Sequence, residues 1–319
     1  MEEIVVCAND ENRKERYAEI LTEHRIENVR LLIDEKIDHL GGPIVAILTG
    51  LKSVEAEFCL TIPCDMPLLQ PRVIEYLFNS ARPFRAVVPM WPNGRLETLT
   101  LVLKRTGALK ITNILCQLGR PRSDDIIRGS LKVLFASIVG EIRALDPELE
   151  SFVNINSRED LIRLQPRRGQ GVVTENLELD VGSLPMSELQ SLQDASQLCR
   201  IGKFLEASRV FSSSAAHLEE GNSFFWAAVS RENEGKSLLS LSRQQSEPEQ
   251  AVKHASSGKN AILKAAHNYG LEAEMHENAR CVFLSERARS DKAWCESLAN
   301  DQRSKSNRYL RNSTRDKTV

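Results

Sequence analysis

The sequence lacks long apolar runs, a basic leader and an excess of charge of either sign. None of its hydrophobic stretches approaches the roughly 20 residues that a helix needs to cross a bilayer. It opens with Met1-Glu2-Glu3 rather than the basic region that begins a signal peptide. Lysine and arginine number 42 against 44 acidic residues, so the charge gives no reason to expect a nucleic-acid or anionic-membrane partner.

Paired cysteines are also absent. The seven cysteines are scattered, no CxxC pair occurs, and the closest two are Cys59 and Cys64. An odd, dispersed set is typical of reduced thiols in a cytosolic protein, so we expect a cytoplasmic location and no disulfide framework. Cys64 precedes an acidic residue of interest, but no histidine lies nearby in the sequence. We therefore interpret Cys64 as a plain thiol rather than a nucleophile.

What is present is a chain of 319 residues, long enough for two domains. Its first part alternates short β-branched runs with helical stretches. Strands are expected at 4–8, 29–33, 58–62, 85–90, 98–103 and 131–136, and helices at 11–24, 43–54, 72–79 and 108–118. Such alternation predicts an α/β fold with a doubly wound, mostly parallel sheet, in which 58–62 is a buried parallel strand. Only the fourth and fifth strands, which flank the turn Pro92-Asn93-Gly94, are expected to form an antiparallel pair.

The character of the sequence changes after residue 166, the predicted end of the α/β domain. Residues 167–185 are rich in glycine and arginine at one end and close with Gly-Ser-Leu-Pro, so we interpret them as a linker. Residues 186–303 are rich in alanine, leucine and serine, which predicts an all-helical domain. Its helices are expected at about 186–201, 203–219, 222–242, 248–269 and 271–300. The domain is either a plain bundle or a stack of helix pairs of the tetratricopeptide kind, and 304–319 is a polar, flexible tail.

The sharpest local signal is the run Ile62-Pro63-Cys64-Asp65-Met66-Pro67. An apolar strand ends here, and a carboxylate follows at its carboxyl end, where open α/β sheets bind their ligands. Magnesium prefers hard oxygen ligands and keeps several waters, so one carboxylate such as Asp65 can hold it against a nucleotide phosphate. The alternative interpretation is an aspartate that only forms a turn before proline.

Two further positions are suited to a nucleotide. Gly41-Gly42-Pro43 leads into a helix, where glycine permits a close backbone approach and the helix N-terminus favours an anion. Asp34 directly follows the strand at 29–33 and can accept hydrogen bonds from a ribose or a base. Both features also have plain structural interpretations, as a common helix start and as a solvated loop aspartate.

A pair of asparagines precedes a short predicted helix at 157–164. Asn154 and Asn156 would point the same way in an extended segment. They could bind a ligand or cap the helix, whose Ser157 and Asp160 have the spacing of a capping box. The chemistry of the residues alone favours the cap.

Taken in this order, the motifs resemble the molybdenum cofactor guanylyltransferase family. The matching runs are IVVCAN at 4–9, LLID at 31–34, GGPIVAI at 41–47, CDMP at 64–67 and FVNINSREDL at 152–161. The resemblance covers about residues 3–165. The Asn-Ile-Asn run is the most discriminating, because related cytidylyltransferases and sugar-phosphate nucleotidyltransferases share the fold and the strand-end aspartate without it.

The resemblance implies a nucleotidyltransferase that joins GMP from GTP to molybdopterin and releases pyrophosphate, with Mg²⁺ as the cofactor. Asp65 would be the catalytic residue that holds the metal and the phosphates. The Asn154/Asn156 pair would face molybdopterin. The remaining nucleotide-binding positions would be Asp34, Gly42, Pro43 and the strand-end position near the base, which is either Asn9 or Cys7.

The sequence departs from the family pattern at its start. Family members open with a strand and a glycine-rich loop of the form LAGGxSxRxGxxK, which cradles the triphosphate, and residues 1–319 contain no such run. The family's GPLAG is Gly-Pro-Ile-Val-Ala at 42–46. Because the first strand of a doubly wound sheet is central, its lack would leave two ladders unpaired. We expect an N-terminally truncated chain whose longer natural form contains the loop, and weak GTP binding without it.

Two other functions stay open at this point. One is a nucleotidyltransferase of the same fold with another substrate, such as a sugar phosphate. The other is an inactive, transferase-like scaffold that carries the helical domain as a protein-interaction module. The histidines of the helical half are scattered and predict no metal site, and its basic tail is interpreted as solvated. Docking to another protein is the role that we expect for this half.

Overall fold

The computed structural model describes residues 3–38, 40–157, 160, 171 and 173–315, with the backbone alone for 302–315. The chain divides into two units, Met1–Leu184 and Pro185–Val319. Within the described part of the chain, no helix is both long and apolar enough to cross a membrane.

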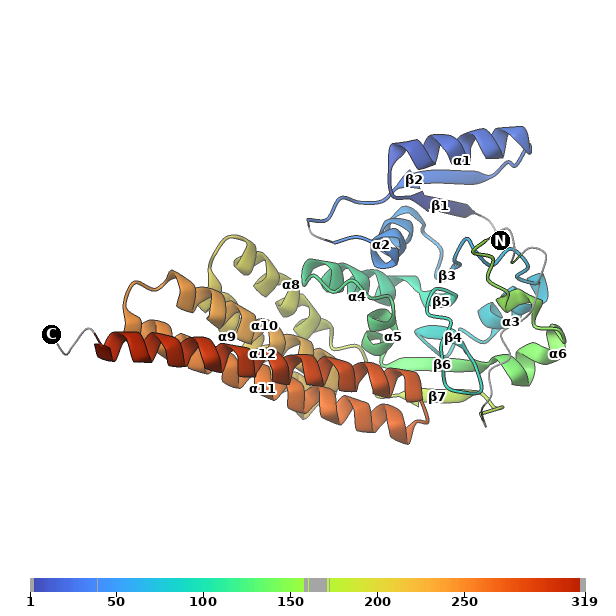
Figure 1. Cartoon of the computed structure of the whole chain (residues 1–319). Helices are drawn as coiled ribbons and strands as arrows, with labels where there is room; N and C mark the ends of the chain where they lie inside the picture. Colours follow the sequence, from blue (N-terminus) through green and yellow to red (C-terminus); the bar gives the residue numbers. More distant parts are fainter. Residues whose placement is uncertain (1–2, 39, 158–159, 161–170, 172, 316–319) are drawn as a thin grey trace. The chain divides into compact units, whose positions relative to one another are not determined.

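Strands and helices alternate along the first unit (Figure 1). Its strands are β1 (Ile4–Ala8), β2 (Val29–Ile33), β3 (Phe58–Thr61), β4 (Ala86–Met90), β5 (Leu101–Lys104), β6 (Lys132–Ser137) and β7 (Leu177–Asp180). Its helices are α1 (Glu11–Glu23), α2 (Pro43–Ser53), α3 (Pro71–Asn79), α4 (Arg105–Gln117) and α5 (Asp124–Ser130), followed by the short turns η1 (Ile138–Ile142), α6 (Arg143–Leu145) and η2 (Glu150–Phe152). Every strand and helix predicted up to residue 136 is confirmed, with ends shifted by a few residues.

The sheet differs from the predicted doubly wound, mostly parallel one. β1 and β2 form a separate parallel pair, and the other strands form a sheet of five in the order β3-β5-β4-β6-β7. In this second sheet only β4 and β6 run parallel. The mostly parallel sheet was a wrong prediction because β5 lies between β3 and β4 and runs antiparallel to both, and because β7, which was not predicted, runs antiparallel to β6. β5 therefore pairs antiparallel with β4, as predicted, and also with β3.

The strand expected to be a buried parallel one, β3, instead lies at the edge of the five-stranded sheet. Of the strands that the structure describes, it pairs only with β5, and its residues are half-buried. β1 likewise pairs only with β2 among the described residues. Among the residues that the structure describes, β1 and β3 therefore each have one edge without a strand partner.

The segment predicted as a linker contains a strand. β7 pairs antiparallel with β6, with Leu177 opposite Phe135 and Asp180 opposite Lys132. Leu177 and Leu179 are buried, whereas Glu178 and Asp180 are exposed. This alternation is the period-two pattern of an edge strand, and the glycine-rich start of the segment obscured it. Most of that start, at 167–170 and 172, lies outside the described residues.

Helix α2 joins the two sheets of the first unit. It is apolar, its buried residues include Ile44, Ile47 and Leu51, and it packs against β1, β2 and α4 (Figure 1). The Nε of Arg105, the first residue of α4, donates to the carbonyl oxygen of Leu51 at 3.0 Å. The loops that follow β1 and β2 are therefore attached to the larger sheet through a rigid helix.

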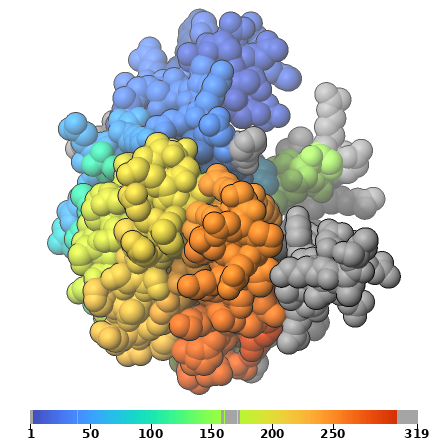
Figure 2. All heavy atoms as spheres, turned by 90° about the vertical axis from the view of Figure 1, so that its left-hand side faces the viewer, coloured from blue at the N-terminus to red at the C-terminus, as the bar shows by residue number. Residues whose placement is uncertain are grey.

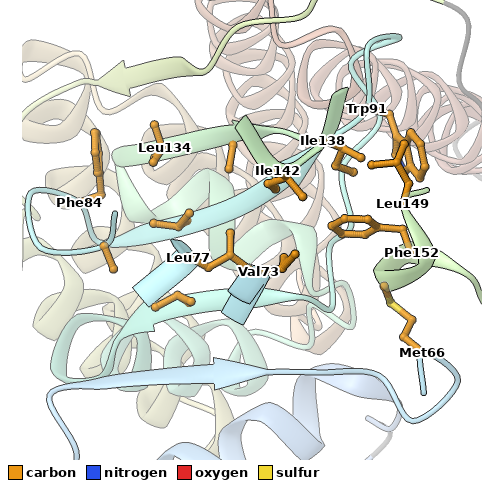
Figure 3. Packing of buried hydrophobic residues seen from close by; sticks show 14 residues of the cluster. Met66, Val73, Leu77, Phe84, Trp91, Leu134, Ile138, Ile142, Leu149 and Phe152 are labelled. Atoms are coloured by element: carbon orange, nitrogen blue, oxygen red, sulfur yellow. The ribbon is translucent and has the colours of Figure 1, made fainter. Parts of the chain in front are cut away.

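A buried core lies against one face of the five-stranded sheet. It gathers residues from α3, from the sheet and from the segment 138–152. At one end of this core, Met66, Trp91, Leu149 and Phe152 lie next to one another (Figure 3). Trp91 and Phe152 meet edge to face, with ring centroids 5.9 Å apart. This end of the core lies directly beneath the loop that contains Asp65.

Helix α5 was not predicted, and all of its residues are buried. Asp125 receives hydrogen bonds from Arg120 Nε at 2.7 Å and from Arg128 Nη1 at 2.8 Å. These guanidinium groups hold the pKa of the Asp125 carboxyl at about 2 in spite of its burial. The charged and apolar residues of the run Asp-Asp-Ile-Ile-Arg are all buried, so the run lacks the alternation of exposed polar and buried apolar residues that predicts a helix.

The second unit consists of helices that pack on their neighbours in chain order. They are α8 (Met186–Arg200), α9 (Phe204–Glu220), α10 (Phe224–Gln244), α11 (Pro248–Asn278) and α12 (Val282–Arg315). The space-filling view shows the yellow and orange segments of this unit packed directly against one another (Figure 2). Ala195, Ala207 and Phe211 are fully buried between these helices.

Three of the helix junctions use the same turn. Gly202, Asn222 and Arg280 have φ values of 77°, 54° and 58°. After each of them, the next backbone N–H reaches back to a carbonyl in the last turn of the preceding helix at 2.8–2.9 Å, as in Lys203 to Leu198. The left-handed residue and this bond end each helix and reverse the chain.

Two boundaries predicted in this unit were wrong. The junction expected near residue 270 lies at 279–281, because Gly270 continues α11 and Arg280 forms the turn. The backbone of α12 is helical as far as Arg315, where a flexible tail from residue 304 was predicted. Glycine is only a weak helix breaker, whereas the left-handed turn is set by packing that no local pattern records.

Candidate functional site

Asp65 lies in the loop that leaves β3, and that loop is anchored at Asp65 and at the residue that follows it. Met66 is buried in the core, and the hydroxyl of Thr100 donates to its sulfur at 3.5 Å. Figure 3 shows Met66 directed at Phe152. The carbonyl oxygen of Asp65 itself accepts the N–H of Ile155 at 2.8 Å. These contacts fix the backbone on which the carboxylate stands.

The segment that contains Asn154 is extended and lies beside the Asp65 loop. Phe152 and Val153 are buried, Asn154 is half-buried, and Asn156 is exposed. The Ile155–Asp65 hydrogen bond places Asn154 next to Asp65, although the two residues are far apart in the sequence. The structure thus brings together two of the residues singled out from the sequence. Asn156 lies one step further toward solvent.

Both of these side chains have a buried oxygen without a partner. Asp65 Oδ1 and Asn154 Oδ1 are inaccessible to solvent and accept no hydrogen bond within the described residues. Buried polar atoms are nearly always hydrogen-bonded, so an exception calls for a ligand, a water or a functional reason. Two such oxygens on adjacent segments form a place where an external cation or donor group can be held.

Asp34, which follows β2, is the third of the predicted site residues with a buried side-chain oxygen that accepts no hydrogen bond within the described residues. Its N–H donates to the Ala8 carbonyl at 2.8 Å, which places it beside the end of β1, and its buried Oδ1 accepts no hydrogen bond from any described residue. Burial raises the pKa of the Asp34 carboxyl above its ordinary value. The residue is therefore held at the carboxyl ends of two parallel strands, with an acceptor atom available.

The Asp34 loop is tied to α2 from the next residue. The N–H of Glu35 donates to Thr49 Oγ1 at 2.9 Å, and that hydroxyl donates to the Val45 carbonyl at 2.9 Å. The carboxylate of Glu35 forms an ion pair with Lys52 at 2.7 Å. Thr49 is thus a supporting residue that the sequence analysis missed, because a lone threonine on an apolar helix gives no signal by itself.

The position at the end of β1 was left open between Asn9 and Cys7. Asn9 is exposed, and its neighbour Asp10 caps α1 by accepting the N–H of Arg13 at 2.8 Å. Cys7 is half-buried, and burial, with a smaller contribution from the charge of Asp34, raises the pKa of its thiol to about 11. Of the two, only Asn9 presents its side chain to solvent at the strand end.

Gly42 and Pro43 form the exposed start of α2. Gly42 has a φ of 86°, a conformation that favours glycine, and it is the N-cap of the helix without any side-chain cap. Pro43 occupies the first turn, where its missing N–H costs nothing. The first-turn N–H groups of a helix lack partners within the helix and can receive an anion from outside.

The capping box predicted for the asparagine segment is confirmed. Asp160 accepts the N–H of Ser157 at 2.8 Å and that of Asn156 at 2.9 Å, while its own N–H donates to Ser157 Oγ at 3.3 Å. These bonds hold the pKa of Asp160 below its ordinary value. They occupy the backbone of Asn156, not the side chain of Asn154. Residues 161–164 of the predicted helix lie outside the described residues.

The predicted site residues thus fall into two groups within the first unit. Asp65 and Asn154 stand beside the five-stranded sheet. Asp34 and the exposed Asn9 stand at the end of the two-stranded sheet, which α2 connects to the larger one. Among the residues that the structure describes, no three His, Cys, Asp or Glu side chains gather as a metal site. The oxygen atoms of Asp65 and Asn154 still fit Mg²⁺, because that ion takes one or two protein ligands together with waters and phosphates.

Comparison with known proteins identifies relatives for this part of the chain. Residues 1–130 match the model of the MobA-like NTP transferase domain. A probable molybdenum cofactor guanylyltransferase of Methanosarcina mazei is 29% identical over 161 residues, which cover 50% of this chain and 70% of that protein. Its counterpart in Methanothermobacter thermautotrophicus is 30% identical over 166 residues, covering 50% and 76%.

A further relative and a solved structure are also similar to part of this chain. A probable molybdenum cofactor guanylyltransferase of Halalkalibacterium halodurans is 31% identical over 140 residues, which cover 43% of this chain and 67% of that protein. The crystal structure of molybdopterin-guanine dinucleotide biosynthesis protein A from Archaeoglobus fulgidus is similar at 25% identity, with a TM-score of 0.40, over 50% of this chain and 76% of that one. The similarity lies in the N-terminal half of the chain.

Proposed function

Because the chain belongs to the MobA-like nucleotidyltransferase family, we propose that it transfers GMP from GTP to the molybdopterin cofactor and releases pyrophosphate. The observation that carries the proposal is the set of three buried oxygens, on Asp34, Asp65 and Asn154, that accept no hydrogen bond within the described part of the chain. Each belongs to a different motif of the guanylyltransferase pattern. A role in binding explains why all three leave an acceptor atom without a partner inside the protein.

The proposal gives each residue a task. Asp65 holds Mg²⁺ and, through it, the phosphates of GTP. Asp34 accepts a hydrogen bond from the guanosine, with Asn9 and the helix start at Gly42-Pro43 lining the same nucleotide. Asn154 and Asn156 bind the pterin acceptor on the other side of Asp65.

In the reaction, an acceptor oxygen attacks the α-phosphorus of GTP, and pyrophosphate leaves with the electron pair of the broken P–O bond. When bound, Mg²⁺ supplies neutralisation of the charge that builds up on these phosphates. The contribution of the chain itself is to fix the two substrates in line, which is worth several kcal/mol of barrier in reactions of this kind. The hydrogen bond between Ile155 and Asp65 serves this alignment, since it joins the acceptor side to the metal side.

The test is transfer of label from α-³²P-GTP to molybdopterin in the presence of Mg²⁺. The assay uses this chain and a form extended upstream in frame, since residues 1–319 contain no LAGG-type loop. Labelled dinucleotide product from either form, and its loss in Asp65→Asn, would support the proposal. Transfer to a sugar phosphate instead would favour a different substrate on the same fold. No transfer by either form to any acceptor would leave the scaffold function, with the helical unit as a protein-docking module.

A further inference from the structure

The two segments that contain Asp65 and Asn154 are tied together at a second point. Besides the Ile155–Asp65 bond, the N–H of Gln70 donates to the hydroxyl oxygen of Ser151 at 3.0 Å. Gln70 is the last residue of the Asp65 loop and the N-cap of α3. Ser151 lies three positions before Asn154, in the turn η2. The two bonds therefore flank Asn154 on one segment, and on the other they are made by Asp65 itself and by Gln70.

Ser151 is itself held in place from inside the protein. It is fully buried, and its N–H donates to Asp146 Oδ2 at 2.8 Å. The other carboxylate oxygen of Asp146 accepts the N–H of Glu150 at 3.2 Å, and Asp146 is 4% exposed. A charged acceptor with two backbone donors orients η2 strongly. The Ser151 hydroxyl thus has little freedom to follow the Asp65 loop if that loop moves.

We propose that Ser151 is a positioning residue of the transfer reaction. Its hydrogen bond to Gln70 sets the separation between the loop that contains Asp65 and the segment that contains Asn154. Asp146 holds Ser151 in position by accepting its backbone N–H. Ser151 touches neither substrate. The inference rests on the proposed function, in which the first segment holds the nucleotide and the second holds the acceptor.

The tie acts on the relative placement of the substrates rather than on the binding of either one. Removing it leaves Asp65 on its loop and Asn154 on its segment, so each substrate keeps its own contacts. A displacement of about 1 Å between reacting groups can lower the rate by about a hundredfold. Loss of the tie is therefore expected to lower kcat and to leave the KM for GTP unchanged.

Two variants remove the bond from opposite ends. Ser151→Ala deletes the acceptor, and Gln70→Pro deletes the donor at a position whose φ of −73° suits proline. Each is expected to lower kcat about 10- to 100-fold, in line with the loss of supporting hydrogen bonds around other sites. The double variant is expected to be no worse than either single one, because both changes remove the same interaction.

Ser137→Ala is the matched control. Ser137 is also fully buried, and its hydroxyl oxygen also accepts one backbone N–H, that of Gly140 at 3.0 Å, but this bond joins neither site segment. It is expected to lose as much thermal stability as Ser151→Ala and to keep its kcat. An equal fall of kcat in the control, an unchanged kcat in Ser151→Ala, or a rise in the KM for GTP would overturn the inference.

A second readout decides the matter if the chain transfers nothing. Mn²⁺ replaces Mg²⁺ in the full chain labelled with ¹⁵N-asparagine, and paramagnetic broadening of the Asn154 side-chain amide signal is measured. Strong broadening in the unmodified chain that weakens in Ser151→Ala would support the tie, even if the proposed reaction had failed. Equal broadening in both proteins, or none in the unmodified chain, would overturn it.

Discussion

Two glycines of the helical unit are expected to respond to alanine in opposite directions. Gly235 in α10 faces Gly258 in α11, and a Cβ built on Gly235 would lie 2.7 Å from the Gly258 carbonyl oxygen and 2.5 Å from Ile262 Cγ1. The first neighbour is backbone and cannot rotate away. A Cβ on Gly270, in the same helix α11, would lie 3.6 Å from the flexible end of Lys292. Gly235 and Gly270 thus both lie within long helices and differ in the room that is available for a Cβ atom.

The magnitudes follow from this difference. Alanine in a helix is worth about 1 kcal/mol over glycine, so Gly270→Ala is expected to stabilise the unit by up to about 1 kcal/mol. At Gly235 the same gain is opposed by overpacking of about 1–3 kcal/mol. Because the backbones of α10 and α11 must move apart to admit the Cβ, we take the upper end of that range and expect the free energy of unfolding to fall by about 2 kcal/mol in total. For a unit of this size each kcal/mol moves Tm by about 3–5 °C.

The assay is thermal unfolding of the full chain, followed by far-ultraviolet circular dichroism. The helical unit dominates that signal because nearly all of it is helix. Gly235→Ala is expected to lower its Tm by about 6–10 °C, and Gly270→Ala to raise it by about 3–5 °C. A Tm for Gly235→Ala at or above that of the unmodified chain would refute the close crossing of α10 and α11.

Other predictions concern the first unit. Asp125→Asn is expected to lower the free energy of unfolding by at least about 2 kcal/mol at neutral pH, because the pKa of Asp125 is about 2 in the folded protein against an ordinary 3.8. This stabilisation is present above about pH 4 and is lost as the pH falls to about 2. Urea unfolding of both proteins at neutral pH and at pH 2 checks this, and an equal difference in stability at the two pH values would contradict it. The Asp34→Asn variant is expected to unfold at a higher temperature than the unmodified chain at neutral pH, because burial destabilises the charged carboxylate. This destabilisation is absent below the ordinary pKa of aspartate and develops as the pH rises through the raised pKa of Asp34. The same variant is expected to bind GTP about 10- to 100-fold more weakly, measured by calorimetry, since it loses a charged hydrogen-bond acceptor; unchanged affinity would remove Asp34 from the site.

Much of the secondary structure could be predicted because the signal is local. The strands at Ile4–Ala8 and Val29–Ile33 are β-branched runs with helices between them, and both appear where the pattern places them. The motif residues could also be found, because a carboxylate or amide after a strand stands out from an apolar background. Their order along the chain suggested the family that the comparisons identify.

What could not be predicted depends on partners distant in the sequence. β7 is recognisable only once its alternating leucines face β6, and α5 only once arginines neutralise its aspartates. The antiparallel pairing of β5 with β4 was predicted, but its second pairing, with the distant strand β3, was not. The helix junction at Arg280 was assigned to Gly270 because local propensity favours glycine, whereas packing selects the turn. Ser151, a serine among many, becomes informative only through its bond to Gln70.

The most direct test of the central claim is calorimetry of GTP binding with and without Mg²⁺. It compares this chain, its form extended upstream in frame, and Asp65→Asn in whichever form binds. We expect binding that requires Mg²⁺ and is lost in Asp65→Asn, because that residue is assigned to the metal and the phosphates. GTP binding that depends neither on Mg²⁺ nor on Asp65, or no binding by either form, would contradict the assignment of Asp65 to the metal and the phosphates of GTP.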